Sequence, residues 1–149
     1  MQLTRFTDLG LRAMMLLSAG EFDDQRVTTR HIAASAAASE NHIAKAVSRL
    51  VELGLVEARR GRVGGLSLTD AGRTASIGWL IRELEGDREV IDCEGGSPCP
   101  LVAGCRLRRA LATAKEAFYA ELDRYTVADL TRAPALTVLP LSLPTVPAR

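Results

Sequence analysis

Residues 39–68 have the sequence SENHIAKAVSRLVELGLVEARRGRVGGLSL, and this stretch carries the pattern on which the predicted fold depends. Ser39 is suited to cap a helix over residues 40–53. The apolar residues of that helix recur at spacings of three and four, as one buried face requires. They are Ile43, Ala46, Val47 and Leu50. Gly54 follows, where helices commonly end in a left-handed glycine.

A β-hairpin is predicted directly after this helix. Residues 55–58 and 66–68 favour strands, and the turn between them is rich in glycine and arginine. Arg59, Arg60 and Arg62 of this turn could contact phosphates or enter a minor groove, or they could form an ordinary solvated turn. A reading helix followed by a basic hairpin is typical of a winged helix-turn-helix domain.

The residues before this stretch supply the other helices of such a domain. Residues 4–19 carry apolar side chains at helical spacing, and Thr28 or Thr29 can cap a short helix that ends near Ala36. We therefore predict a mainly α-helical fold with one small β-hairpin, in which residues 1–70 form a winged helix-turn-helix DNA-binding domain.

Polar residues of the two central helices are candidates for contact with double-stranded DNA. Asn41 suits adenine, whereas Lys45 and Arg49 suit guanine or a phosphate. His42 could equally be an exposed residue without such a role. Residues 26–62 hold seven Lys or Arg against three Glu, a local charge of +4. The candidate contacts are Thr28, Arg30, Ser39, Asn41, His42, Lys45, Ser48, Arg49, Arg59, Arg60 and Arg62.

Two further helices are predicted in residues 71–130. The first starts at Thr69 and Asp70 and ends near Gly86, and its Trp79 is expected to pack against neighbouring helices.

The second of these helices, over residues 107–125, carries an apolar stripe. The stripe residues are Leu107, Leu111, Ala114, Phe118, Leu122 and Tyr125. Such a stripe is buried either against a twin helix of a second chain or within its own chain, and we expect the former, a homodimer. Residues 131–149 contain four prolines and no periodicity, which predicts an extended tail.

Three cysteines, the only ones in the chain, lie between these helices in the segment CEGGSPCPLVAGC, residues 93–105. Five residues separate Cys93 from Cys99 and Cys99 from Cys105, and the glycines and prolines among them predict a loop that can aim three sulfurs at one point. An odd number of cysteines argues against a disulfide framework, and zinc usually takes thiols in closer pairs. The spacing favours an iron–sulfur cluster.

Composition limits the other possibilities. The chain has 149 residues, a net charge of +1 and no apolar run of membrane-spanning length, and no signal peptide precedes it, so we expect a cytoplasmic protein without a membrane partner. Residues 61–65 lack the lysine and serine of a phosphate-binding Walker loop, which argues against an enzyme. A regulator whose cysteines oxidise directly and a zinc-stabilised interaction module stay open as alternatives.

In this order the motifs resemble those of winged-helix iron–sulfur transcription regulators, a family that includes the nitric-oxide sensor NsrR and the cluster-assembly regulator IscR. The matching segments are LTRFTDLGLR at residues 3–12, IAKAVSRL at 43–50, RGRVGGL at 60–66 and the three-cysteine loop. The resemblance covers residues 1 to 130. IscR-like members have a histidine ligand soon after the third cysteine, and its absence here favours the NsrR branch. This branch implies a dimeric repressor that binds palindromic DNA half-sites and releases them when nitric oxide reacts with its cluster.

Three cysteines leave a fourth ligand to be found for either a [2Fe–2S] or a [4Fe–4S] cluster, and we favour [4Fe–4S]. Such a cluster has four irons, whereas the loop offers three thiolates. Asp8 lies in the family-like N-terminal segment, on a helix that could approach the loop of the partner subunit, and is our first choice. Solvent or an exogenous ligand is the alternative, and Asp8 could instead form an exposed ion pair with Arg12.

Overall fold

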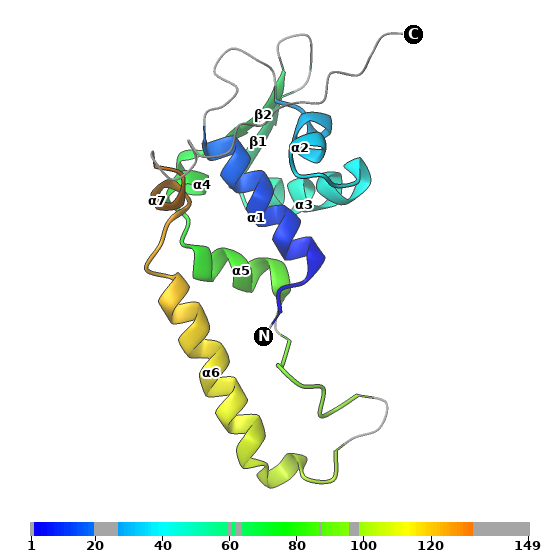
Figure 1. Ribbon diagram of the computed structural model, residues 1–149, viewed down its shortest axis with the longest axis vertical. Coiled ribbons are helices and arrows are strands. Elements are labelled where there is room, and N and C mark those ends of the chain that lie inside the picture. The colour runs from blue at the N-terminus through cyan, green and yellow to red at the C-terminus, as the bar shows by residue number, and fades with distance from the viewer. Residues whose placement is uncertain are drawn as a thin grey trace.

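The computed structural model describes residues 2–19, 27–59, 61, 64–86, 88–95 and 99–132. In chain order the elements are α1 Arg5–Ser18, α2 Thr29–Ser35, α3 Glu40–Glu52, β1 Val56–Arg59, β2 Gly65–Leu68, α4 Asp70–Thr74, α5 Ile77–Glu85, the 3-10 helix η1 Val102–Gly104, α6 Arg106–Leu122 and α7 Val127–Thr131. Helix α6 projects from a body formed by the other α-helices and the hairpin (Figure 1). Within the described part of the chain, none of the helices has the length and apolarity that a bilayer crossing requires.

Helices α2 and α3 form the predicted helix-turn-helix. Thr28 caps α2 by accepting a hydrogen bond from the backbone N–H of His31 at 3.3 Å. The turn between the helices contains Ala37 in the left-handed region, with φ 49°. Ser39 is the N-cap residue of α3, as predicted, but its side chain makes no capping hydrogen bond. Gly54 follows α3 with φ 71°, which confirms its predicted role.

The wing is a two-stranded antiparallel sheet in which Arg59 of β1 pairs with Gly65 of β2. Strand β1 begins one residue later than predicted and β2 one residue earlier. The N–H of Leu66 donates to the carbonyl of Val27 at 2.9 Å, which attaches the wing to the segment before α2.

A single hydrophobic core joins α1, α2, α3 and α5. Its largest fully buried apolar residues are Leu9, Met14, Ile32, Ile43, Leu50, Leu80, Ile81 and Val127. The predicted apolar face of α3 is therefore confirmed. The start of α1 is also bonded to the end of α5, because the N–H and the hydroxyl of Thr4 both donate to Oε1 of Glu85, at 2.7 and 3.0 Å.

The prediction of a single helix from Thr69 and Asp70 to near Gly86 is wrong, because the chain forms two helices there, α4 and α5. The backbone is extended at Ala75, with ψ 131°. The N–H of Val127 donates to the carbonyl of Ala75 at 3.1 Å, and the N–H of Ile77 donates to the carbonyl of Tyr125 at 2.8 Å. The break therefore depends on a segment about fifty residues away.

Two other expectations also need correction. Trp79 is 38% exposed, whereas Ile77, Leu80, Ile81 and Leu84 form the buried face of α5. The predicted long helix is present as α6 but ends at Leu122, and α7 after it was not predicted. Residues 133–149, which make up nearly all of the predicted tail, lie outside the described residues.

Candidate DNA-reading surface and thiol loop

Helix α3 has one buried and one exposed face. Asn41, His42, Lys45 and Ser48 are all exposed, while the apolar face of the helix packs against α1 and α2. The predicted reading residues therefore lie where a helix can enter a major groove without unfolding the domain.

The candidates on α2 and at its ends have different surroundings. Arg30, in the first turn of α2, is exposed, and so is Ser39. The hydroxyl of Thr28 is already engaged as the α2 cap. If Thr28 contacts DNA, its hydroxyl must do so while it still accepts the capping hydrogen bond of α2.

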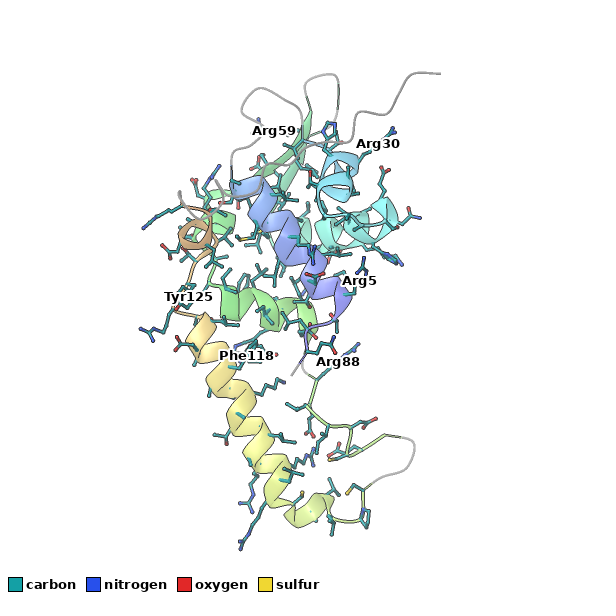
Figure 2. All side chains as sticks on the ribbon, viewed as in Figure 1. Arg5, Arg30, Arg59, Arg88, Phe118 and Tyr125 are labelled. Carbon is teal, nitrogen blue, oxygen red and sulfur yellow. The ribbon has the colours of Figure 1, made fainter. Side chains whose placement is uncertain are left out.

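The described part of the wing places one of its three predicted arginines. Arg59 of β1 is exposed, and its Nη2 lies 3.2 Å from Oε2 of Glu57. Figure 2 shows Arg59 toward the same end of the molecule as Arg30. Arg60 and Arg62 lie outside the described residues.

Arg49 is the member of the predicted set that the structure ties to another helix. Its Nη2 lies 3.2 Å from Oε2 of Glu83 on α5, and its Nη1 lies 3.4 Å from Oε2 of Glu52 on its own helix. The Arg49 side chain is 38% exposed. The positive charge at the end of α3 is thus shared with the helix that leads into the cysteine segment.

We call residues 88–105, between α5 and α6, the thiol loop. Its three cysteines are free thiols, of which Cys93 is buried and the other two are partly exposed. The N–H of Cys99 donates to the carbonyl of Cys93 at 3.0 Å. Cys105 caps α6, with its Sγ accepting a hydrogen bond from the N–H of Arg108 at 3.4 Å. The loop therefore turns back on itself between the first two cysteines, as its composition predicts.

The chemistry of these donors fits an iron–sulfur cluster. Thiolates are the ligands that such clusters take. Burial, followed by the charge of Cys99, raises the pKa of the Cys93 thiol, so ligation of Cys93 must displace its proton. Among the described residues, however, no three His, Cys, Asp or Glu side chains converge as a ready ligand set. Loop closure must accompany binding.

Asp8 forms an ion pair with Arg12, which was the alternative to its predicted role as a cluster ligand. Nε of Arg12 donates to Oδ1 of Asp8 at 2.8 Å, and the Asp8 side chain is 37% exposed. Within the described part of the chain, the structure does not bring Asp8 together with the cysteines as a ligand set.

A carboxylate–arginine cluster in the thiol loop was missed from the sequence. Arg108 of α6 bonds Glu89 and Glu94, which lie on either side of Cys93. The signal was present, since an acidic run precedes Cys93 and a basic run follows Cys105. Opposite charges at two ends of one loop predict such a contact only once the loop is known to fold back.

Helix α6 leaves much of its apolar stripe exposed. Leu107 is 61% exposed, Phe118 36% and Tyr125 42%, and Figure 2 shows the last two where α6 meets the body. The buried aromatic residue of α6 is instead Tyr119, which lies under the guanidinium of Arg82, 4.2 Å from the ring centroid. Packing of the whole stripe within the chain, the alternative to a dimer, does not occur in the described structure.

A helix-turn-helix with an exposed polar face, a two-stranded wing and a cysteine loop ahead of a projecting helix define a winged-helix transcriptional regulator. The Rrf2 family model, described as iron-dependent transcriptional regulator, matches residues 3–133. The chain belongs to the Rrf2 family, and it is a DNA-binding regulator rather than an enzyme.

Named relatives support this placement. A transcriptional repressor NsrR from Streptomyces coelicolor is 58% identical over 139 residues, 93% of this chain and 94% of the relative. A transcriptional regulator NsrR from Geobacillus kaustophilus is 40% identical over 132 residues, 87% of this chain and 89% of the relative. Among solved structures, IscR of T. potens is similar with a TM-score of 0.67 and 25% identity, covering 87% of this chain and 85% of that one. The cysteine regulator CymR of B. subtilis shares the fold, with a TM-score of 0.66, 24% identity and coverage of 88% and 96%.

Proposed function

We propose that this protein is a dimeric, cytoplasmic transcriptional repressor that senses nitric oxide through an iron–sulfur cluster held by Cys93, Cys99 and Cys105. The observation that carries the proposal is the joint presence of an exposed reading helix and three free thiols in one loop of the same chain. The printed names of the two NsrR relatives support the assignment as a repressor.

DNA recognition in this proposal uses α3 and the wing. Asn41, His42, Lys45 and Ser48 face the major groove, where Asn can bond adenine and Lys guanine or phosphate. Arg30 and the wing arginines contact the phosphate backbone, which sets register and makes binding salt-dependent. The division into a reading domain over residues 1–70 and a sensing region over 71–130 stays part of the proposal.

Dimerisation follows from the exposed stripe of α6. Leu107, Phe118 and Tyr125 are large apolar residues that a single chain leaves in water, and burial of apolar area is the main driving force of association. A twin α6 packed on this stripe gives a two-fold axis, so the two reading helices meet palindromic half-sites about one helical turn, or a multiple of it, apart.

Four ligands are assigned to a [4Fe–4S] cluster. Cys93, Cys99 and Cys105 supply three thiolates, and Asp8 of the partner subunit supplies the fourth ligand, because this carboxylate is partly exposed on α1, where a second chain can reach it. When bound, such a cluster supplies iron that reacts with nitric oxide. A carboxylate oxygen would bind cluster iron more weakly than a thiolate does. The iron held by Asp8 would therefore be the one from which an effector displaces a protein ligand most readily.

The protein's part in the switch is to couple loop order to helix placement. While the cysteines are ligated, the thiol loop holds a fixed path between α5 and α6. When they are released, the loop gains freedom, and the separation of the two reading helices is no longer set. Effector coupling of this kind is typically worth about 1–3 kcal/mol in binding.

The experiment that tests the proposal compares DNA binding of two states of one protein. Anaerobically cluster-loaded protein is titrated onto a palindromic operator fragment in a gel-shift assay, before and after addition of nitric oxide. We expect affinity to fall by roughly 5- to 150-fold on addition of nitric oxide. Equal affinity of the two states would reject the proposed mechanism, whereas loss of affinity on peroxide treatment of iron-free protein would favour direct thiol oxidation.

A further inference from the structure

Arg108, in the first turn of α6, makes the densest set of ion-pair contacts in the thiol loop. Its Nε lies 3.0 Å and 2.8 Å from the two carboxylate oxygens of Glu89, and its Nη2 also bonds Glu89. The same Nη2 lies 2.7 Å from Oε1 of Glu94. One guanidinium therefore joins two carboxylates from different parts of the loop.

These contacts connect both ends of the cysteine segment. Glu89 precedes Cys93 by four residues and Glu94 follows it directly, while Arg108 lies three residues after Cys105. The backbone N–H of Arg108 donates to Sγ of Cys105. The side chain of Arg108 thus fixes the surroundings of the first cysteine, and its main chain fixes the third.

The Arg108 cluster differs from an ordinary surface ion pair. The fork of a guanidinium matches a carboxylate in two parallel hydrogen bonds, which adds geometric specificity that a lysine cannot supply. The Arg108 side chain is 27% exposed, and its hydrogen bond with Glu89 lowers the pKa of that carboxyl. By contrast, the neighbouring Arg106 and Arg109 are exposed.

Helix α6 meets α5 near its C-terminal half, around Tyr119, and its N-terminal half extends away from the body (Figure 1). Across the space beside this N-terminal half, Nζ of Lys115 donates to the carbonyl of Arg88 at 2.6 Å. Arg108 makes the contacts nearest to the first cysteine, because it bonds Glu89 and Glu94 on either side of Cys93.

We infer that Arg108 is a positioning residue of the cluster site: through Glu89 and Glu94 it holds residues 88–95, which carry Cys93, against the first turn of α6, which Cys105 caps. The inference deepens the proposed function and rests on its cysteine site. A preorganised loop has less conformational freedom to lose on binding than an open one. Arg108 also offsets the negative charge that three thiolates add beside these two carboxylates.

Hydrogen–deuterium exchange of the apo protein tests this inference without any metal. Peptides that cover residues 88–105 are followed in the wild type, in Arg108→Gln and in the matched control Arg109→Gln, which removes the same charge one residue away. We expect exchange in Arg108→Gln to be about threefold faster or more, as for a segment whose local opening costs less, and Arg109→Gln to match the wild type. Arg108→Lys is expected to recover only part of the protection.

A second measurement separates the role of Arg108 from the cluster hypothesis. After anaerobic reconstitution with iron and sulfide, Arg108→Gln should lose its visible absorbance to an iron chelator several-fold faster than Arg109→Gln, with unchanged thermal unfolding of the body. Equal loop exchange in the two variants overturns the inference, whatever the metal content. If the wild type takes up no iron, the proposed function fails, yet the exchange experiment still decides whether Arg108 orders the loop.

Discussion

The guanidinium of Arg49 lies 3.2 Å from the carboxylate of Glu83, so the helix that carries the predicted DNA contacts is bonded to the helix that leads into the thiol loop. Both side chains are little more than one-third exposed, 38% and 35%. An ion pair this accessible adds only about 0.2–1 kcal/mol to stability. The ion pair matters instead for DNA binding, because Glu83 competes with DNA phosphates for the guanidinium of Arg49.

Replacement of Glu83 by Gln should therefore strengthen DNA binding. Without this carboxylate, Arg49 can turn to the phosphate backbone, and we expect affinity to rise about two- to fivefold and the salt dependence to steepen by about 0.9, the slope for one added phosphate contact. Fluorescence anisotropy of a labelled operator at several salt concentrations measures both. Glu121→Gln, which removes an equal charge paired with Arg124 on α6, is the control. Weaker binding of Glu83→Gln would mean that the pair positions α3 instead.

The turn of the helix-turn-helix should be improved by glycine. Ala37 has φ 49°, a conformation that costs an L-residue roughly 1–2 kcal/mol and glycine almost nothing. Allowing for the greater freedom of glycine in the unfolded chain, we expect Ala37→Gly to raise the free energy of unfolding by about 0.5–1 kcal/mol. Urea denaturation measures the change. Ala34→Gly, inside α2, should do the opposite, and destabilisation by both variants would contradict the turn geometry.

Removal of the Asp8 side chain should weaken the cluster without unfolding the protein. The Asp8–Arg12 pair is exposed, and helix pairs of this spacing contribute about 0.2–0.5 kcal/mol. We expect Asp8→Ala to assemble a cluster that chelator removes faster than in the wild type. Arg12→Ala, which breaks the same ion pair but keeps the carboxylate, should leave the cluster as stable as before. Unchanged spectra and lifetime in Asp8→Ala would exclude it as a ligand.

The stability that the N-terminal cap of α7 contributes should depend on pH in the acid range. Thr126 donates to Oδ2 of Asp129 through its hydroxyl at 2.6 Å and its N–H at 3.0 Å, and these bonds lower the pKa of Asp129 below its ordinary 3.8. The folded state therefore binds this proton less tightly than the unfolded state, so the stabilisation is present at neutral pH and is lost as the pH falls below 3.8. The difference in melting temperature between wild type and Asp129→Asn should shrink on acidification. A difference in melting temperature that stays constant as the pH falls would contradict this role of the capping bonds.

Local patterns in the sequence were sufficient for the reading half of the fold. The apolar spacing of α3, the cap of α2 and the glycine at position 54 each act within a few residues. The first and last were predicted correctly, and the structure selects Thr28 from the two predicted caps, Thr28 and Thr29. The turn was harder to place, because three consecutive alanines favour helix by propensity. Tertiary packing of α2 against α3 overrides that preference at Ala37.

The parts that escaped prediction depend on distant contacts. The break at Ala75 forms because residues 125–127 bond the backbone on both sides of it. The pairing of Arg49 with Glu83 and of Arg108 with Glu89 joins segments 34 and 19 positions apart. The Arg49–Glu83 pair has no local signal, and the opposite charge runs around the cysteines predict the Arg108–Glu89 pair only if the loop folds back. Charges that looked available for DNA or solvent are therefore engaged within the chain. The three cysteines were found easily because they are the only ones and lie in one loop.

The most direct test of the central claim is a count of iron and sulfide in anaerobically purified protein, followed by titration with nitric oxide under an absorbance spectrum. We predict a brown protein with about four iron and four sulfide per chain, whose visible absorbance bleaches or shifts at low nitric oxide. About two of each would point to a [2Fe–2S] centre, which also takes four ligands, and would reopen the assignment of the fourth ligand and of the signal. A protein that stays colourless and iron-free after anaerobic reconstitution would contradict the claim.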